Sequence, residues 1–309
     1  MKDLYQGKDF WKNYMEGWFG GELIEKWERT VKLQSINSIK GDIGLEIYDT
    51  GEKRNPTIVF AHGIAGYARL LLPFLMPLYE KGFNIIAPDL EGFGYNSRVK
   101  GDFCWDEHLH NLKDTVGFAR KLFGGQVYLG GGSMGGPLAY ATDARYDCAD
   151  GLICWCLWDF ADREFIQNTS TTKKLTYPLM PIMNLASVFL GKLTFRTTRF
   201  VSYQALTSDA RFNSLIMRDP QSGTTVSLRG VLSLVLQSKP DLAHKEYQKP
   251  VLVCQPSGDE MTPSYYTQKV FDKLGSRKKR YVVFPGAHFP IEKAVYVDWA
   301  KEVGNFVRA

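Results

Sequence analysis

Short apolar runs without polar alternation recur along the chain and are separated by longer amphipathic stretches. The runs are TIVFAHG (57–63), NIIAPDL (84–90), QVYLGGG (126–132), GLICWCLW (151–158), PVLVCQ (250–255) and YVVFPG (281–286). Helices are predicted over 67–81, 105–123 and 139–146, and from 262 and 291 onwards. Apolar strands joined by helices are typical of a parallel sheet buried on both faces. The pattern therefore predicts an α/β protein with a mostly parallel central sheet flanked by helices.

The N-terminal region shows other patterns of apolar and polar residues. Residues 1–30 show helical periodicity. An aromatic side chain recurs on one helical face at Phe10, Tyr14 and Trp18. This stripe predicts an N-terminal helical arm packed on the main core, and the alternative is an element at a membrane surface or pocket rim. Residues 31–50 predict two antiparallel strands joined by a turn at Gly41 and Asp42.

The strand–helix rhythm is interrupted between Asp159 and Pro250. Roughly 90 positions separate these residues, whereas a parallel crossover needs only about a dozen. We therefore expect a catalytic core made of residues 1–160 and 250–309, with an inserted helical cap at residues 161–249. A helix is predicted over 226–236 within it, and an apolar run over 179–190 is expected to pack as core or to line an acyl pocket.

Composition and charge narrow the classes of protein. Of the 309 residues, 44% are hydrophobic and 23% charged, which excludes global disorder. The net charge of +5 is too small for a dedicated nucleic-acid binder. The cap holds 12 Lys and Arg against 6 Asp and Glu, so it carries the basic excess. This excess is interpreted either as a solvated face or as a means of attraction to anionic substrates or of peripheral contact with anionic interfaces.

Targeting and cofactor signals are missing from the sequence. The first residues are charged throughout, and the run over 179–190 is too short and too interrupted to span a bilayer. We therefore expect a soluble, cytoplasmic protein. The five cysteines form no C-x₂-C pair, and Cys154 and Cys156 are expected to pack on one face of a strand. His108 and His110 are expected on different helix faces, and no nucleotide-binding glycine motif is present, so no metal or cofactor is predicted.

A candidate nucleophile lies where a predicted strand meets a predicted helix. Gly131-Gly132-Ser133-Met134-Gly135 fits the G-x-S-x-G pattern. A tight strand-to-helix turn holds such a serine in a strained conformation with its hydroxyl exposed. The helix N-terminus adds positive partial charge, and the backbone amide of Met134 faces the position of a developing oxyanion.

A base and an orienting carboxylate are expected further along the chain. Asp259 and His288 each follow a predicted parallel strand, so both are expected at the same sheet edge as Ser133. The order Ser, Asp, His suits this arrangement. Glu260 is less suitable because neighbouring side chains diverge, whereas Asp159 is an alternative acid because it ends another strand at that edge.

A second oxyanion donor is expected after the first parallel strand. The loop HGIAG (62–66) occupies that position. Gly63 permits a sharp turn, and the amide of Ile64 can pair with that of Met134. His62 is expected to anchor the loop rather than to take part in catalysis.

Five segments together carry a family resemblance. HGIAG, PDLEGFG, GGSMGG, SGDEMTP and GAHFP occur in order over about 230 residues, and the sequence resembles an α/β-hydrolase of the monoacylglycerol lipase and lysophospholipase-like group. The resemblance implies the α/β-hydrolase fold and a Ser133, Asp259, His288 triad. Lipases of this group often have histidine at the position of Gly132, whereas Gly-Gly-Ser also occurs in proline-iminopeptidase-like members.

These features together predict a carboxylic ester hydrolase that forms an acyl-enzyme without metal or organic cofactor. The expected substrate is a small-molecule ester or an acyl lipid such as an acylglycerol. Aminopeptidase, thioesterase or carbon–carbon bond hydrolysis on the same triad is the alternative, and a non-catalytic binding protein of the same fold is a further one.

Overall fold

The predicted parallel sheet is present in the computed structural model, which describes residues 5–96, 99–169, 182, 185, 187, 189–199 and 201–309. Within these residues, eight strands form one sheet in the order β1-β2-β4-β3-β5-β6-β9-β10. The first two pairings, β1 with β2 and β2 with β4, are antiparallel, and all the others are parallel. The expectation of an α/β fold with a mostly parallel sheet is confirmed.

Burial follows the position of each strand in the sheet. The strands are β1 Val31–Ser38, β2 Gly41–Tyr48, β3 Thr57–Ala61, β4 Asn84–Pro88, β5 Val127–Gly132, β6 Gly151–Trp155, β9 Val251–Pro256 and β10 Lys279–Phe284. The five central strands, β3 to β6 and β9, are buried along their whole length, because helices cover both faces. The predicted turn at Gly41 and Asp42 is misplaced, since both residues pair with β1 and the turn lies at Ile39 and Lys40.

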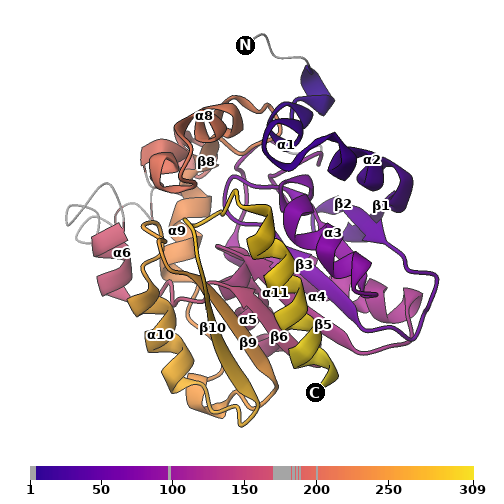
Figure 1. Ribbon diagram of the computed structural model, residues 1–309. Coiled ribbons are helices and arrows are strands. Elements are labelled where there is room, and N and C mark those ends of the chain that lie inside the picture. Colours follow the sequence, from indigo (N-terminus) through magenta and orange to yellow (C-terminus); the bar gives the residue numbers. More distant parts are fainter. Residues whose placement is uncertain are drawn as a thin grey trace.

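Helices cover the two faces of the sheet in separate layers. The helices of the core are α3 Leu72–Glu80, preceded by the 3₁₀ turn η2 Ala68–Leu71, with α4 Trp105–Leu122, α5 Gly135–Tyr146, α10 Ser264–Lys273 and α11 Lys293–Arg308. Helices α3 and α11 pack together in front of the sheet in Figure 1, and α4 and α5 pack together behind it. Successive strand residues alternate between the two layers: Ile58 and Phe60 face the first, and Val59 and Ala61 face the second.

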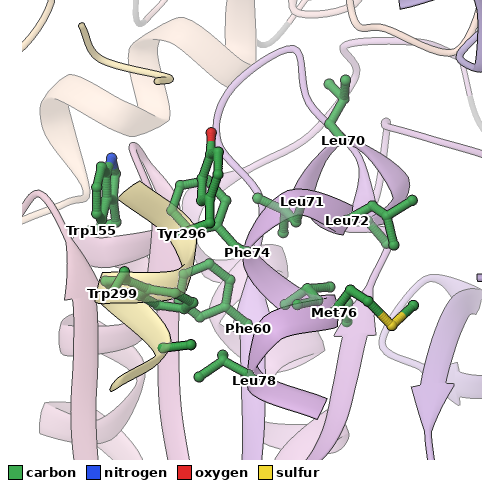
Figure 2. Close-up of a cluster of buried hydrophobic side chains, with 14 of the residues drawn as sticks. Phe60, Leu70, Leu71, Leu72, Phe74, Met76, Leu78, Trp155, Tyr296 and Trp299 are labelled. Atoms are coloured by element: carbon green, nitrogen blue, oxygen red, sulfur yellow. The ribbon is translucent and has the colours of Figure 1, made fainter. Parts of the chain in front are cut away.

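An aromatic cluster joins the first layer to the sheet (Figure 2). The ring of Phe74 in α3 lies 4.7 Å from Tyr296 and 5.2 Å from Trp299, both in α11. Its centroid is also 5.0 Å from that of Trp155, the last residue of β6. Edge-to-face aromatic pairs of this kind add about 0.5–1.5 kcal/mol each beyond burial. The cluster therefore fixes both helices close to the carboxyl ends of the strands.

The N-terminal arm packs on this layer, which confirms the expectation of a packed arm. It contains η1 Gly7–Asp9, α1 Lys12–Phe19 and α2 Gly21–Thr30. Tyr14, with no exposed surface, belongs to the same hydrophobic cluster as α3. In addition, Arg69 and Glu46 form a buried ion pair of 2.7 Å, and the indole of Trp27 donates to Glu46 and stacks 4.3 Å from the Arg69 guanidinium. The arm thus covers a charge pair of the core.

The inserted segment (residues 161–249) adds no strand to the main sheet within its described residues. Its elements are α6 Arg163–Thr169, β7 Thr194–Arg196, η3 Thr197–Arg199, η4 Tyr203–Ala205, α8 Ala210–Arg218, β8 Thr225–Ser227, α9 Leu228–Leu236 and η5 His244–Glu246. In Figure 1, α8, β8 and α9 gather at one end of the sheet, and α8 packs against α1.

Two expectations about this segment need correction. The helix predicted over 226–236 begins only at Leu228, because residues 225–227 pair antiparallel with β7 and Ser227 caps the helix by accepting from the Gly230 amide. Of the apolar run 179–190, the described side chains of Ile182, Leu185, Phe189 and Leu190 are exposed and form neither core nor pocket lining. Leu179, Met180, Met183 and Val188 lie outside the described residues. No helix in the described part of the chain carries an apolar stretch long enough to cross a membrane.

His108 and His110 lie on different faces of α4, as predicted. His108 is fully buried and stacks on Phe103, and its Nε2 lies 2.9 Å from the carbonyl oxygen of Glu91. Burial lowers the pKa of His108 to about 3. His110 is only partly buried and lies beside Tyr146.

The depressed pKa of His108 predicts a pH-dependent stability. An unfolded histidine takes up a proton near pH 6.5, whereas the buried one does so only near pH 3. Stability is therefore complete above pH 6.5 and falls as the pH drops towards 3. Between pH 7 and pH 5, the free energy of unfolding of the wild type should fall by about 2 kcal/mol more than that of His108→Gln. Glutamine can keep the donor to the Glu91 carbonyl without titrating. Urea unfolding at both pH values measures this, and equal pH dependence would contradict it.

Candidate active site

Ser133 occupies a strained turn between β5 and α5. Its φ of +56° lies in the left-handed region, which costs a residue other than glycine about 1–3 kcal/mol. The amide of Ser133 donates to the carbonyl of Trp155 (3.0 Å), and the Ser133 carbonyl accepts from the amide of Gly136 (2.9 Å). These bonds to a neighbouring strand and to the following helix hold the strained conformation. The turn has the form that the sequence motif predicts.

Two glycines of the motif allow this turn to form. A Cβ atom on Gly135 would lie 2.4 Å from the carbonyl oxygen of Ala61 in β3, and one on Gly131 would lie 2.5 Å from the backbone of Gly135. Backbone at such distances cannot accommodate a side chain. The first turn of α5 therefore packs directly against β3 because both positions are glycine.

Asp259 and His288 follow β9 and β10 and are in direct contact. Nδ1 of His288 lies 2.8 Å from Oδ2 of Asp259, and both side chains are buried. The alternative acid, Asp159, instead accepts from the amide of Ala161 and lies 3.6 Å from Nε2 of His244. Glu260 is exposed. Of the three carboxylates weighed from the sequence, only Asp259 contacts His288.

Several donors converge on Asp259. Its Oδ1 accepts from the amides of Met261 (2.9 Å) and Thr262 (2.8 Å), and its Oδ2 accepts from the Thr262 hydroxyl (2.6 Å). Burial alone would raise the pKa of Asp259. The charge of His288 and the hydrogen bonds from His288 and Thr262 outweigh burial, so the pKa lies below its ordinary value. Asp259 is therefore an ionised acceptor at neutral pH and keeps a proton on Nδ1 of His288.

Cys156 also contacts Asp259, which the sequence interpretation missed. Cys156 was expected to share a core face with Cys154, but β6 ends at Trp155 and Cys156 has a φ of +68°. Its thiol consequently turns to the other face and donates to Oδ2 of Asp259 (3.3 Å). Burial, followed by the charge of Asp259, raises the pKa of this thiol, so it remains protonated. Its position at the end of a strand on the catalytic edge was the one available signal.

The thiol, carboxylate and imidazole of Cys156, Asp259 and His288 lie within 4.8 Å of one another, a spacing that suits a metal ion. Oδ2 of Asp259 already accepts from His288, Thr262 and Cys156, and from the side-chain amide of Gln255. Together with the two amides on Oδ1, these donors occupy the acceptor sites of the Asp259 carboxylate. We therefore assign this group to the support of His288.

Trp155 links the serine turn to the histidine turn. Its carbonyl accepts from the amide of Ser133, and its indole Nε1 donates to the carbonyl of His288 (3.0 Å). The ring packs in the aromatic cluster around Phe74, where Figure 2 shows it at the end of the group. A single residue at the end of β6 thus orients two predicted catalytic residues.

The HGIAG loop (residues 62–66) passes directly beside Ser133. A Cβ atom on Gly63 would lie 2.8 Å from that of Ser133. Neither the amide of Ile64 nor that of Met134 donates a hydrogen bond to another residue in the described part of the chain. Both amides are therefore available for an oxyanion. Nε2 of His62 accepts from the amide of Leu90 (3.0 Å), so Nδ1 carries the proton and donates to the Gly63 carbonyl (2.8 Å), which agrees with the anchoring role expected for His62.

An apolar cavity opens onto these groups. Ser133, His288 and the HGIAG loop form part of its wall. The remaining lining residues are Leu70, Leu71, Phe74, Gly132, Trp155, Val201, Tyr203, Leu206, Ile216, Met261 and Phe289. Among the described residues that line it, none is Asp or Glu. Four of them, Val201, Tyr203, Leu206 and Ile216, come from the inserted segment, so this segment closes one side of the cavity.

Comparison with protein families agrees with the fold. A family model described as serine aminopeptidase, S33, matches residues 52–289. The chain therefore belongs to this family of hydrolases. A curated relative, an uncharacterized 31.7 kDa protein from the traX-finO intergenic region of Escherichia coli, is 23% identical over 82% of this chain and 92% of its own length.

Solved structures share the architecture at low sequence identity. A soluble variant of monoglyceride lipase from Saccharomyces cerevisiae superposes with a TM-score of 0.68 at 17% identity, covering 90% of this chain and 95% of that one. A carboxyl esterase from Bacillus coagulans gives a TM-score of 0.69 at 19% identity, covering 90% and 98%. The fold is the α/β-hydrolase fold that the sequence resemblance implies.

Substitution of a motif glycine tests the close packing of α5 on β3. Gly135→Ala should lower the free energy of unfolding by at least about 2 kcal/mol, because the new methyl group overlaps the Ala61 carbonyl. Gly117→Ala in α4 is the matched control: nothing lies within 4 Å of its Cβ position, so alanine should stabilise by up to about 1 kcal/mol. Equal effects of the two changes on urea unfolding would rule out the packing constraint.

Proposed function

We propose that the protein is a carboxylic ester hydrolase that uses Ser133 as nucleophile, His288 as base and Asp259 as the orienting acid. The observation that carries this proposal is the arrangement at the cavity. Ser133 and His288 both line the apolar cavity, and Oδ2 of Asp259 lies 2.8 Å from Nδ1 of His288. A buried, ionised carboxylate on Nδ1 leaves Nε2 as the basic atom of the imidazole.

The reaction proceeds in two halves. His288 takes the proton of the Ser133 hydroxyl while the oxygen attacks the ester carbonyl, and the alcohol leaves with that proton. Water then attacks the acyl-enzyme with His288 again as base, which releases the acid and restores Ser133. In both halves the amides of Ile64 and Met134 hold the oxyanion, and a donor of this kind contributes about 2.7–4 kcal/mol to transition-state stabilisation.

Acyl esters such as acylglycerols are the substrates that the cavity favours. Its lining is almost entirely apolar, with Leu71, Phe74, Ile216 and Phe289 among the walls. An acyl chain fits such a surface because its burial removes apolar area from water. The solved structures with this fold include proteins named monoglyceride lipase and carboxyl esterase. We further propose that residues 161–249 act as a cap that completes the acyl side of the site.

Aminopeptidase activity is the second candidate, because the family description names it. A substrate with a free amine carries a positive charge, which needs a carboxylate partner when it is buried. No Asp or Glu occurs among the described lining residues. The cavity therefore favours a neutral acyl group over a charged amino acid.

Replacement of the nucleophile tests the mechanism. Ser133→Ala should lower p-nitrophenyl butyrate hydrolysis by at least about 10⁴-fold, because the acyl-enzyme cannot form. It should also abolish labelling by a fluorophosphonate probe, in which the serine oxygen displaces fluoride. The control Ser214→Ala, at an exposed serine of α8, should keep both activities. Near wild-type turnover in Ser133→Ala would refute the proposal.

A substrate panel separates the two candidate activities. Esters of butyric and octanoic acid should be hydrolysed with kcat/KM at least about 100-fold above that for prolyl or alanyl p-nitroanilide, because an amide is intrinsically less reactive than an ester and an unpaired ammonium in this cavity costs several kcal/mol. Acetylation of the same amino group should raise turnover of the anilides. Comparable or faster cleavage of the free aminoacyl substrates would instead support an aminopeptidase.

A further inference from the structure

The HGIAG loop contains a backbone strain at Ala65, beside the proposed oxyanion donor. The amide of Gly66 donates to the carbonyl of Gly63 (3.1 Å), so Gly63 to Gly66 form a turn with Ile64 and Ala65 in the middle. Ala65 has a φ of +61°. At this third position of a turn, a positive φ favours glycine. The turn therefore needs support from outside the loop.

The inserted segment supplies contacts to this residue. The carbonyl oxygen of Ala65 accepts from the hydroxyl of Ser222 (2.7 Å) and from the amide of Gly223 (3.0 Å). Ser222 is 3% exposed, so water does not compete with its bond. These two donors hold the Ala65 carbonyl in the direction that the positive φ imposes.

A buried carboxylate fixes the same turn of the inserted segment. Oδ1 of Asp219 accepts from the amide of Gln221 (2.8 Å), and the Asp219 carbonyl accepts from the amide of Ser222 (3.1 Å). Oδ2 of Asp219 accepts from the hydroxyls of Tyr67 (2.5 Å) and Tyr14 (2.6 Å). Tyr67 directly follows the HGIAG loop. Asp219 therefore connects the turn that contains Ser222 to the residue after this loop.

Tyr14 extends the connection to the N-terminal arm. Its hydroxyl lies 2.8 Å from that of Tyr67, and its ring contacts Phe212 of the inserted segment at 5.5 Å. Tyr14, Tyr67 and Asp219 have at most 2% of their surface exposed. Tyr14 lies outside residues 52–289, which the family model matches.

We propose that Ser222, Asp219 and Tyr14 are positioning residues that fix the oxyanion donor Ile64 relative to Ser133. This inference rests on the proposed function and adds a role for the inserted segment and the arm in it. Without the bonds to Ala65 and Tyr67, the turn can relax from its strained conformation. The Ile64 amide is then no longer fixed beside Ser133, and the oxyanion loses part of its stabilisation.

Substitution of Ser222 tests the inference. Ser222→Ala should lower kcat for p-nitrophenyl butyrate by about tenfold and leave KM within about twofold, because an oxyanion donor acts mainly in the transition state. Affinity for a boronic acid inhibitor, which forms a tetrahedral adduct on serine, should fall by a similar factor. Ser222→Thr keeps the hydroxyl and should restore most of kcat.

Ser233→Ala is the matched control. Ser233 is also a buried serine of the inserted segment. Its hydroxyl accepts from the amide of Trp105 in the core (2.9 Å) and makes no hydrogen bond to the HGIAG loop. It should lower the melting temperature as Ser222→Ala does, but leave kcat unchanged. For the arm, Tyr14→Phe should lower kcat, whereas Trp18→Phe, which removes the indole bond to Asp209 (3.0 Å), should not.

Failure of this inference and failure of the proposed function give different results. Wild-type kcat and boronic acid affinity in Ser222→Ala, with wild-type esterase activity present, would overturn this inference alone. The same reduction of kcat in Ser233→Ala as in Ser222→Ala would also overturn it, since the effect would then be general destabilisation. A wild-type protein that neither hydrolyses esters nor reacts with the fluorophosphonate probe contradicts the proposed function itself.

Discussion

The close packing of the serine turn against β3 is the constraint on which the site depends. Gly135 brings the start of α5 into contact with the Ala61 backbone. In the same region, Gly63 lies in contact with Ser133. Ser133 joins β5 to the helix held at this position and has a φ of +56°. The hydrogen bond from its amide to Trp155 stabilises this geometry. A strained residue persists only where the surrounding structure determines its position, and this turn meets that condition.

The carboxyl edge of the sheet gathers the remaining groups. Adjacent parallel strands end at similar heights, so residues after β6, β9 and β10 meet although they are distant in sequence. Cys156 and His288 both contact Oδ2 of Asp259 there, and Trp155 donates to the carbonyl of His288. The low pKa of Asp259 results from this convergence of donors and of the His288 charge despite burial. The edge is therefore a hydrogen-bonded unit, and its members are positioned by one another.

The N-terminal arm and the inserted segment both contact residues beside the candidate site, through Tyr14 and Ser222 respectively. The arm covers the buried ion pair between Arg69 and Glu46. Ala68, the residue before Arg69, donates its backbone amide to Asp89 of the core. A buried ion pair is unfavourable unless further partners satisfy it, and Trp27 supplies one through its indole N–H. The arm also reaches Asp219 through Tyr14. Removal of the arm would thus expose charge and leave a carboxylate with one tyrosine partner instead of two.

The sequence alone determined the sheet, the helices on its two faces and the strand ends on which Ser133, Asp259 and His288 lie. These depend on local pattern: apolar runs, the glycines around a serine, and the order of motifs. Tertiary structure decided between Asp259 and Asp159, because that choice depends on which carboxylate reaches an imidazole on another strand. It also turned Cys156 away from Cys154 and brought Ser222 to Ala65, across 157 positions of sequence. Hydrogen bonds between distant segments leave no periodic signal in the chain, so only the folded arrangement defines them.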